Sequence, residues 1–472
     1  MSVELDSEIA AVKLGDLRSR FRGALIRPGE EAYTETRRVW NGAIDRRPAL
    51  IARCTDADDV VTALRFARER ELPISVRGSG HSVAGHAVCD GGLMIDLSLM
   101  KGVSVDRTGR RARAAAGASW AEFDLATQRH GLATTGSTVS RVGVGGLALL
   151  GGFGHLLRRH GLAVDNLLAV DLITAEGKQL HVDTNSEPEL LWGLRGGGGN
   201  FGIATGLTFD LHPVGPLVLG GPIYWPLEQA QQVLRFLRDL ASVAPDDLGV
   251  MIVAQQAPPL PFLPPEAYGT PAFGLLVTWA GDLAEGMRVL APLEQLGNPL
   301  GELVRPLPYR AIQTLLDGSA APGNGALWRS VRISQLSDAA IEDFVSLAES
   351  LPTPLSFLTG WMIGGAASRV ASDATALGQR EVGFELRLIA MWPPEDPDDA
   401  EHIAWAHQGW ERLRVHGNGR AYPTFLSDEG SVGVQAAYQD GWSRLVGLKN
   451  RYDPTNVFRL NVNIPPSQSG SK

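Results

Sequence analysis

Two histidines and a cysteine lie together in the glycine-rich stretch RGSGHSVAGHAVCDGG, which spans residues 77–92. Such a cluster could hold a metal ion, supply a nucleophile, bind phosphate or simply turn the chain. A zinc site of the HExxH type needs two histidines four residues apart on a helix. His81 and His86 are five residues apart, as are His402 and His407. We therefore predict that the protein has no metal site.

Other motifs with a known chemistry are missing or stand in the wrong context. The sequence has neither a phosphate-binding P-loop nor the GxSxG motif of a serine nucleophile. Gly197, Gly199 and Gly202 do match the GxGxxG pattern. In dinucleotide-binding folds this pattern follows a strand and opens a helix, whereas here the predicted order is helix, loop, strand. The context therefore disfavours a Rossmann nucleotide site.

Glycine is concentrated in three loops, at residues 77–85, 143–154 and 196–202. Glycine allows a close approach of the backbone to a ligand, and successive exposed N–H groups form anion-binding nests. The simpler interpretation is that these glycines serve tight turns in a crowded sheet. Three clusters, each beside a predicted strand, favour one large flat ligand that carries phosphates.

The composition excludes several classes of protein. The 472 residues carry a formal net charge of −9, which argues against a non-specific nucleic-acid binder. The most apolar stretch, at residues 142–157, is shorter than the roughly 20 residues that span a membrane, and the first residues lack the pattern of a signal peptide. Cys54 and Cys89 are too few for a disulfide framework, and we interpret both as ordinary small residues. We expect a cytoplasmic protein that binds neither nucleic acid nor membrane.

The pattern of apolar residues predicts the elements that position these loops. Residues 50–71 indicate a short strand and an amphipathic helix capped by Thr55 or Asp56, and the next strand runs into the first glycine loop. Residues 166–183 predict a hairpin with its turn at Glu176-Gly177. Beyond residue 213, helices alternate with strands, which is typical of an antiparallel sheet covered by helices on one face.

Five motifs occur in an order that resembles a known family. They are RGSGHS after LPISV, GGLMIDLSLM, VGVGGLALLGGFGHLLRRHGLAVDNLLAVDLITAEG, ELLWGLRGGGGNFGIAT and RYDPTNVFRLNVNI. Together they resemble the FAD-linked oxidases of the berberine bridge enzyme-like group, in the vanillyl-alcohol oxidase/p-cresol methylhydroxylase superfamily. The resemblance implies a two-lobed α+β flavin-binding fold. It divides the chain into an FAD-binding domain at 1–213, a substrate-binding domain at 214–415, and a C-terminal segment at 416–472 that returns to the first domain.

The resemblance also implies how FAD is held. His81 stands at the position of the family's covalent flavin histidine. Val139 stands where many relatives have a second, cysteine bond to the flavin, so the expected link is monocovalent. His86 has two interpretations, a second polar contact near the FAD pyrophosphate or a plain loop histidine, and we favour the latter. The other expected cofactor-binding residues are Arg77, Gly78, Ser79, Gly80, Ser82, Gly143, Val144, Gly145, Gly146, Gly152, Gly154, Gly199, Gly202, Ile203, Asn461 and Asn463.

The implied reaction is hydride transfer from a small organic alcohol or amine, such as a secondary metabolite, to flavin N5, with O2 as the acceptor that gives hydrogen peroxide. A base that takes the substrate proton lowers the barrier. Tyr422, Tyr438 and Glu385 are the candidates. Two other functions stay open: a flavin dehydrogenase with another acceptor, and a flavin-binding protein without turnover. The sequence does not predict the substrate or the oligomeric state.

Period-two alternation separates Glu385 and Arg387 from the apolar side chains of the strand at residues 382–390. One face carries Val382, Phe384, Leu386 and Leu388. The other face carries Glu385 and Arg387. If the second face looks at the flavin, the two charged residues form a catalytic pair. If it faces solvent, they form a surface pair. Trp361 is a further candidate beside the flavin, and its alternative role is core packing.

Overall fold

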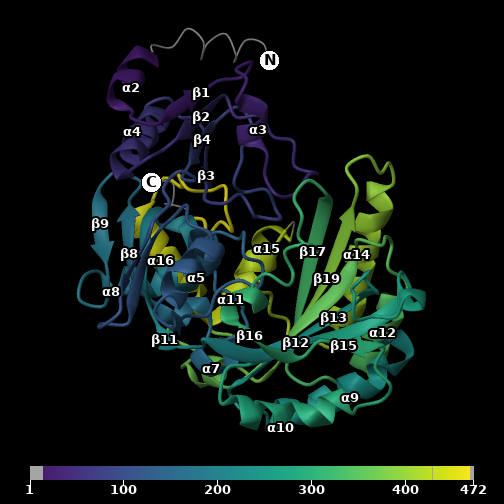
Figure 1. Cartoon of the computed structure of the whole chain (residues 1–472). Coiled ribbons are helices and arrows are strands. Elements are labelled where there is room, and N and C mark those ends of the chain that lie inside the picture. The colour runs from purple at the N-terminus through teal and green to yellow at the C-terminus, as the bar shows by residue number, and fades with distance from the viewer. Residues whose placement is uncertain (1–13, 428, 468–472) are drawn as a thin grey trace.

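A four-stranded sheet with the order β1-β2-β4-β3 forms the upper part of the molecule in Figure 1. The computed structural model describes residues 14–427 and 429–467. The strands are β1 (Ala24–Ile26), β2 (Leu50–Arg53), β3 (Ile74–Arg77) and β4 (Leu93–Asp96), and the helices are α2 (Leu14–Arg20), α3 (Tyr33–Arg37) and α4 (Ala57–Arg68). Asp56 caps α4 by accepting from the Asp59 amide, as one of the two predicted caps. The first glycine loop begins where β3 ends.

A five-stranded antiparallel sheet with the order β5-β6-β10-β8-β9 follows. Its strands are β5 (Val103–Asp106), β6 (Arg111–Ala115), β8 (Leu167–Ile173), β9 (Gln179–Val182) and β10 (Ile203–Asp210). Around it lie α5 (Trp120–Gln128), α6 (Val144–Leu149), α7 (Leu157–His160), η1 (Ala163–Asn166), α8 (Pro188–Gly197) and η2 (Gly198–Asn200), and β7 (Leu132–Ala133) pairs with β11 (His212–Pro213). The structure confirms the hairpin, in β8 and β9, and the order helix, loop, strand around residues 187–210.

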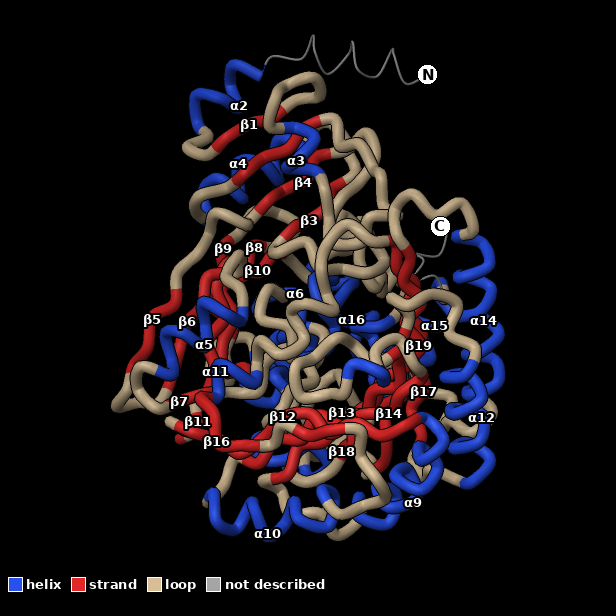
Figure 2. The backbone as a smooth tube through the Cα atoms, turned by 45° about the vertical axis from the view of Figure 1, so that its right-hand side comes forward, coloured by secondary structure: helices blue, strands red, loops and turns tan. Residues whose placement is uncertain are grey.

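The largest sheet has eight strands, all paired antiparallel, in the order β15-β12-β14-β13-β18-β19-β17 with β16 also on β12. They are β12 (Leu217–Pro226), β13 (Leu248–Gln256), β14 (Pro271–Trp279), β15 (Gly301–Glu302), β16 (Arg305–Pro308), β17 (Gly325–Ile333), β18 (Phe357–Ile363) and β19 (Gly383–Trp392). The helices α9 (Ala230–Ala241), α10 (Leu283–Glu294), α12 (Asp338–Glu349) and α14 (Asp399–Arg414) cover its outer face (Figure 2). The predicted antiparallel sheet with helices on one face is confirmed, and so is the α+β class.

Side chains alternate along β19 as predicted. Phe384, Leu386 and Leu388 pack with the covering helices, whereas Glu385 lies on the opposite, inner face of the sheet. Val382 differs from the prediction because it precedes the strand and is 42% exposed. Both faces of β19 are buried, which means that the charged inner face does not meet solvent.

The remaining elements are short helical segments and the helices of the C-terminal segment. They are η3 (Leu227–Gln229), η4 (Pro265–Ala267), α11 (Tyr309–Ile312), α13 (Ala366–Arg369), η5 (Pro423–Phe425), α15 (Gly430–Tyr438), η6 (Gln439–Gly441) and α16 (Trp442–Tyr452). Between β18 and β19, Arg380 forms a buried bidentate ion pair with Asp165 of η1, at 2.7 and 2.8 Å. No helix in the described ranges has the length and apolarity that crossing a membrane requires.

The C-terminal segment packs against the first lobe, where α16 lies among its elements in Figure 1. Lys449 is fully buried; its Nζ pairs with Asp453 at 2.7 Å and donates to the Asn200 carbonyl at 3.0 Å. The Asn200 side chain in turn donates to the Val462 carbonyl at 2.8 Å and accepts from the Ile464 amide at 2.8 Å. These bonds hold the tail against the third glycine loop. The expected domain boundaries at residues 213 and 415 stay predictions.

Candidate active site

The three glycine loops line one cavity of about 260 Å3, which the tail closes with Phe458, Leu460 and Val462. The loops follow β3, enclose α6 and precede β10, so the sheets hold them together. The expected cofactor-binding residues that line the cavity are Gly78, Ser79, Gly80, His81, Ser82, Gly143, Gly145, Gly146, Gly199, Gly202, Ile203 and Asn461. Ser79 joins two of the loops, because its hydroxyl accepts from the Gly143 amide at 2.7 Å.

Glycine at two of these positions is not required by the packing of the protein. A Cβ atom added at Gly146 or at Gly199 would meet no protein atom within 4 Å, and both residues line the cavity. The side-chain oxygen of Asn461 is buried beside them without a hydrogen-bond partner. Backbone N–H groups that no side chain covers on the cavity side suit a ligand with many hydrogen-bond acceptors, such as the phosphates of a dinucleotide. The cavity therefore fits FAD.

His81 lies in this cavity with its ring stacked on that of Trp40, the centroids 5.6 Å apart and the planes at 22°. Burial and the charge of Arg141 lower the pKa of His81 to about 4, and Asp317 opposes them. The imidazole is therefore neutral at neutral pH. A neutral ring has a free electron pair on one nitrogen, which bond formation to an electrophilic carbon requires.

Several expected cofactor-binding residues do not line the cavity. Arg77 turns away, and its guanidinium donates to the Thr36 carbonyl. Gly152 is needed by the protein itself, because an added Cβ would lie 2.6 Å from the Ala163 side chain; at Gly154 it would lie 2.2 Å from a backbone oxygen. The other residues outside the lining are Val139, Val144 and Asn463.

Two polar side chains of the lining were not among the expected cofactor-binding residues. His86 lines the cavity, which agrees with the less favoured of its two interpretations, a polar contact to the cofactor, and burial followed by the charge of Arg46 lowers its pKa to about 4. Thr424 also faces the cavity, and its hydroxyl donates to the Leu150 carbonyl at 3.0 Å. The only signal in the sequence was the position of His86 in the glycine-rich stretch at residues 77–92.

Glu385 lies on the inner face of the large sheet, in a small second cavity of about 10 Å3. Its neighbours around this cavity are Phe153, Leu162, Arg332, Ile363, Ala367, Gln379 and Tyr422. Glu385 is fully buried, so it is not half of a surface pair. Burial raises the pKa of Glu385 to about 6, against the opposing effects of Arg332, Ser330 and Arg387. The Ser330 hydroxyl lies near, but neither carboxylate oxygen accepts a hydrogen bond of good geometry.

The two tyrosine candidates are placed differently. Tyr422 shares the second cavity with Glu385; its ring packs on Phe153 with centroids 4.2 Å apart, and burial raises the pKa of its hydroxyl. Tyr438 does not reach either cavity, because its hydroxyl donates to the Gly196 carbonyl at 2.9 Å and supports the third glycine loop from behind. The geometry therefore does not support Tyr438 as the base.

Trp361 is buried in the core, with its ring edge-on to His155 at 5.7 Å between centroids. It stands directly opposite Glu385 on the neighbouring strand, and so it shares the inner face of the sheet. It lines neither of the two cavities. This placement agrees with the alternative role of core packing.

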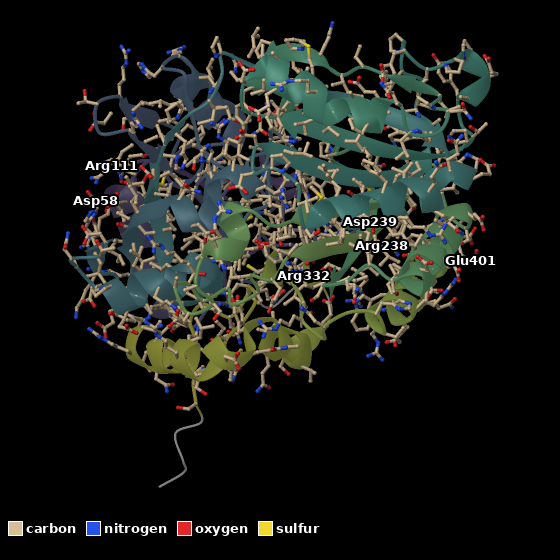
Figure 3. All side chains as sticks on the ribbon, turned by 90° about the horizontal axis from the view of Figure 1, so that it is seen from below. Asp58, Arg111, Arg238, Asp239, Arg332 and Glu401 are labelled. Carbon is tan, nitrogen blue, oxygen red and sulfur yellow. The ribbon has the colours of Figure 1, made fainter. Side chains whose placement is uncertain are left out.

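Arg332 is the charged residue that sequence reasoning missed. It stands directly opposite Glu385 in the pairing of β17 with β19, and it lines the same small cavity. Figure 3 shows it near the middle of the molecule, whereas Asp58 and Glu401 lie at the edges. Within the part of the chain that the structure describes, no group of three metal-ligating side chains occurs.

Comparison with known proteins gives a consistent result. Residues 48–183 match the family described as FAD binding domain, and residues 427–465 match the family described as berberine and berberine like. The chain is 30% identical over 461 residues to (R)-6-hydroxynicotine oxidase of Paenarthrobacter nicotinovorans, covering 95% of this chain and 98% of that protein. An uncharacterized FAD-linked oxidoreductase of Bacillus subtilis (strain 168) is 29% identical over 456 residues, with 95% and 98% covered.

The fold resembles that of a solved relative over nearly its full length. The crystal structure of 6-hydroxy-D-nicotine oxidase from Arthrobacter nicotinovorans superimposes with a TM-score of 0.85 at 27% identity, covering 94% of this chain and 98% of that chain. A chitooligosaccharide oxidase superimposes with a TM-score of 0.83 at 20% identity, covering 96% and 99%, which is a likeness of fold alone.

Proposed function

Because the chain belongs to the berberine bridge enzyme-like family of FAD-linked oxidoreductases, we propose that it is an oxidase with FAD joined covalently to His81. FAD, when bound, accepts a hydride from the substrate and passes the electrons to O2, which gives hydrogen peroxide. The proposed substrate is a small organic molecule with an oxidisable alcohol or amine. The protein would act on it in the space between the glycine cavity and the inner face of the large sheet.

One observation carries the covalent assignment: a neutral histidine stands in the cavity among the glycine loops. His81 is held by its stacking on Trp40, which fixes the direction of the ring. A second link through sulfur has no support, because Cys54 and Cys89 are both buried and neither lines the cavity. We therefore propose a single covalent bond.

We assign the proton acceptor to Glu385. A base works best when its pKa is near the working pH, and burial brings the pKa of Glu385 to about 6. Tyr422 is less suited, because burial and the charge of Glu385 raise the pKa of its hydroxyl. Glu385 would take the proton of the substrate O–H or N–H group while the hydride leaves the neighbouring carbon.

The covalent link is tested by denaturing the purified yellow protein in acid and separating protein from free flavin. We expect the flavin to stay with the wild-type chain and to be released from His81→Ala. His86→Ala, which changes the other histidine of the same loop, is the matched control and should keep the flavin attached. Release from the wild type, or retention in His81→Ala, would contradict the covalent assignment but not FAD binding.

The reaction is tested by reducing the protein and following its reoxidation in air. Fast reoxidation with formation of hydrogen peroxide is expected of an oxidase. Slow reoxidation in air, together with fast reoxidation by an artificial acceptor, would instead favour the dehydrogenase. A flavin that no alcohol or amine in a substrate panel can reduce would favour a flavin-binding protein without turnover.

A further inference from the structure

The inner face of the large sheet carries more positive than negative charge. From this excess we infer that the substrate carries a carboxylate, which binds to Arg387 and Arg332 beside Glu385. The inference rests on the proposed function, because it names the substrate class of that same site. The charged cluster consists of Arg332, Glu385 and Arg387.

Three donor atoms of the charged cluster have no hydrogen-bond partner among the described residues. The Nε and Nη2 atoms of Arg387 are buried without a hydrogen bond, and so is the Nε atom of Arg332. The two residues are only 7% and 2% exposed. A buried donor on a charged group is costly to leave unpaired, so such donors normally have a partner. Several unpaired donors in one place indicate that a ligand supplies the acceptors.

The surrounding residues do not balance the two positive charges. Glu385 supplies one negative charge, and burial keeps Tyr422 neutral by raising its pKa. Asp165 is already paired with Arg380 in a buried bidentate contact. Glu381 is exposed, and it meets Arg332 through its backbone carbonyl. Counted over the described residues, one buried positive charge is therefore left over, and a buried charge without a partner is strongly destabilising.

Other ionisable groups near the sheet do not change this balance. Arg329 and Glu429 form a buried ion pair at 2.5 Å. Arg329 projects to the helix-covered side of β17, where it lies over Trp410 of α14. Burial lowers the pKa of His155 to about 3, so that this histidine is neutral as well.

The position of the charged cluster favours the substrate over FAD as the source of the missing negative charge. Among the described residues, none from β17, β18 or β19 lines the cavity that fits FAD. Arg332 and Glu385 line the second cavity with Tyr422 and Phe153, whereas the Arg387 guanidinium lies against the Phe425 ring. A ligand would therefore reach Arg387 from the side that the Phe425 ring covers.

The carboxylate would take the place of an aromatic ring. The guanidinium of Arg387 lies 4.5 Å from the centroid of the Phe425 ring, and the second cavity has room for about one water molecule. Phe425 belongs to the short turn η5, whose movement would uncover the guanidinium. Arginine binds a carboxylate through two parallel N–H bonds, which fixes the orientation of the ligand.

The test compares matched neutral and charged probes on FAD-loaded protein. Benzoate, phenylacetate and 3-phenylpropionate are titrated by calorimetry beside their neutral amides. We expect at least one carboxylate to bind about tenfold or more tightly than its amide. Equal affinities, or no binding by any of the carboxylates, would overturn the inference.

Variants then test which residue causes the preference for a carboxylate over its amide. Arg387→Met should bring the ratio of the two affinities close to one, and Arg387→Lys should keep part of the preference because it keeps the charge. Arg288→Met, at an exposed arginine of α10, removes one charge far from the site and should leave the ratio unchanged. An unchanged ratio in Arg387→Met, in protein of wild-type melting temperature, would contradict the assignment.

The two proposals fail in different ways. Protein that takes up no FAD, or whose reduced flavin does not react with O2, contradicts the proposed function. Protein that holds FAD and reacts with O2 but shows no preference for a carboxylate contradicts only the inference. A change in flavin reduction potential in Arg387→Met, without any change in the affinity ratio, would place the missing charge on the flavin and would also overturn the inference.

Discussion

Glu385 is the residue whose protonation should decide the rate. Burial raises the pKa of Glu385 to about 6, and a base acts only in its deprotonated form. We expect kcat/KM to rise with pH through about 6 and to fall away below it. Glu385→Gln should remove this limb and lower kcat/KM by about 10²–10⁴-fold.

Tyr422→Phe serves as the comparison for this pH profile. It removes the second ionisable group of the same cavity and should keep the limb near pH 6. A wild-type profile that is flat from pH 5 to pH 8, or a limb that survives in Glu385→Gln, would assign the proton acceptor to another group.

Sequence analysis singled out some of the residues that line the two cavities and missed others. His81 followed from its place in a motif, and Glu385 from the period-two alternation of its strand. Arg332 was missed, because an arginine on a strand looks the same whether its face is buried or in solvent. Only the cross-strand register, which places Arg332 opposite Glu385, shows that the two residues share a site.

Among the elements, helix α6 offers a direct test of where FAD lies. Gly146 in α6 and Gly447 in α16 are both helical glycines at which an added Cβ would meet no protein atom within 4 Å. Replacing either by alanine should stabilise the apoprotein by about 0.5–1 kcal/mol. Gly146→Ala alone should weaken FAD binding, because its Cβ projects into the cavity.

The measurement is the thermal stability of both apoproteins together with their FAD content after reconstitution. If His81 links the flavin covalently, both variants are compared on a His81→Ala background, where binding is reversible. Equal FAD affinity in Gly146→Ala and Gly447→Ala would mean that the cofactor does not approach α6.

Elements were predicted well where one period was repeated, as in the hairpin β8–β9 and in the helix-covered sheet. The roles of the individual glycines in the second glycine loop were not predicted well. A glycine that approaches a ligand and a glycine that approaches its own backbone have the same letter in the sequence. Gly154 proved to be of the second kind, because an added Cβ would meet the Gly136 oxygen.

For the whole molecule, the ion pair of Arg380 and Asp165 joins two segments that lie far apart in the sequence. Both side chains are buried, at 6% and 8% exposure. Arg380→Met would leave the Asp165 carboxylate buried without its partner, and we expect it to lower the free energy of unfolding by about 3–5 kcal/mol. Arg27→Met, in the exposed pair with Glu30, should change it by less than about 1 kcal/mol. Urea unfolding of the three proteins measures both values, and similar losses would mean that the buried pair stabilises the fold no more than the exposed pair does.

The hydrogen bonds between Asn200 and the C-terminal tail limit when the cavity can be completed during biosynthesis. Asn200 bonds to residues 462 and 464, and the cavity is closed by side chains at 458–462. A nascent chain emerges from the ribosome in order, so the loops at 77–203 are exposed long before their last wall exists. The cavity therefore cannot close around FAD before residues 458–464 have left the ribosome.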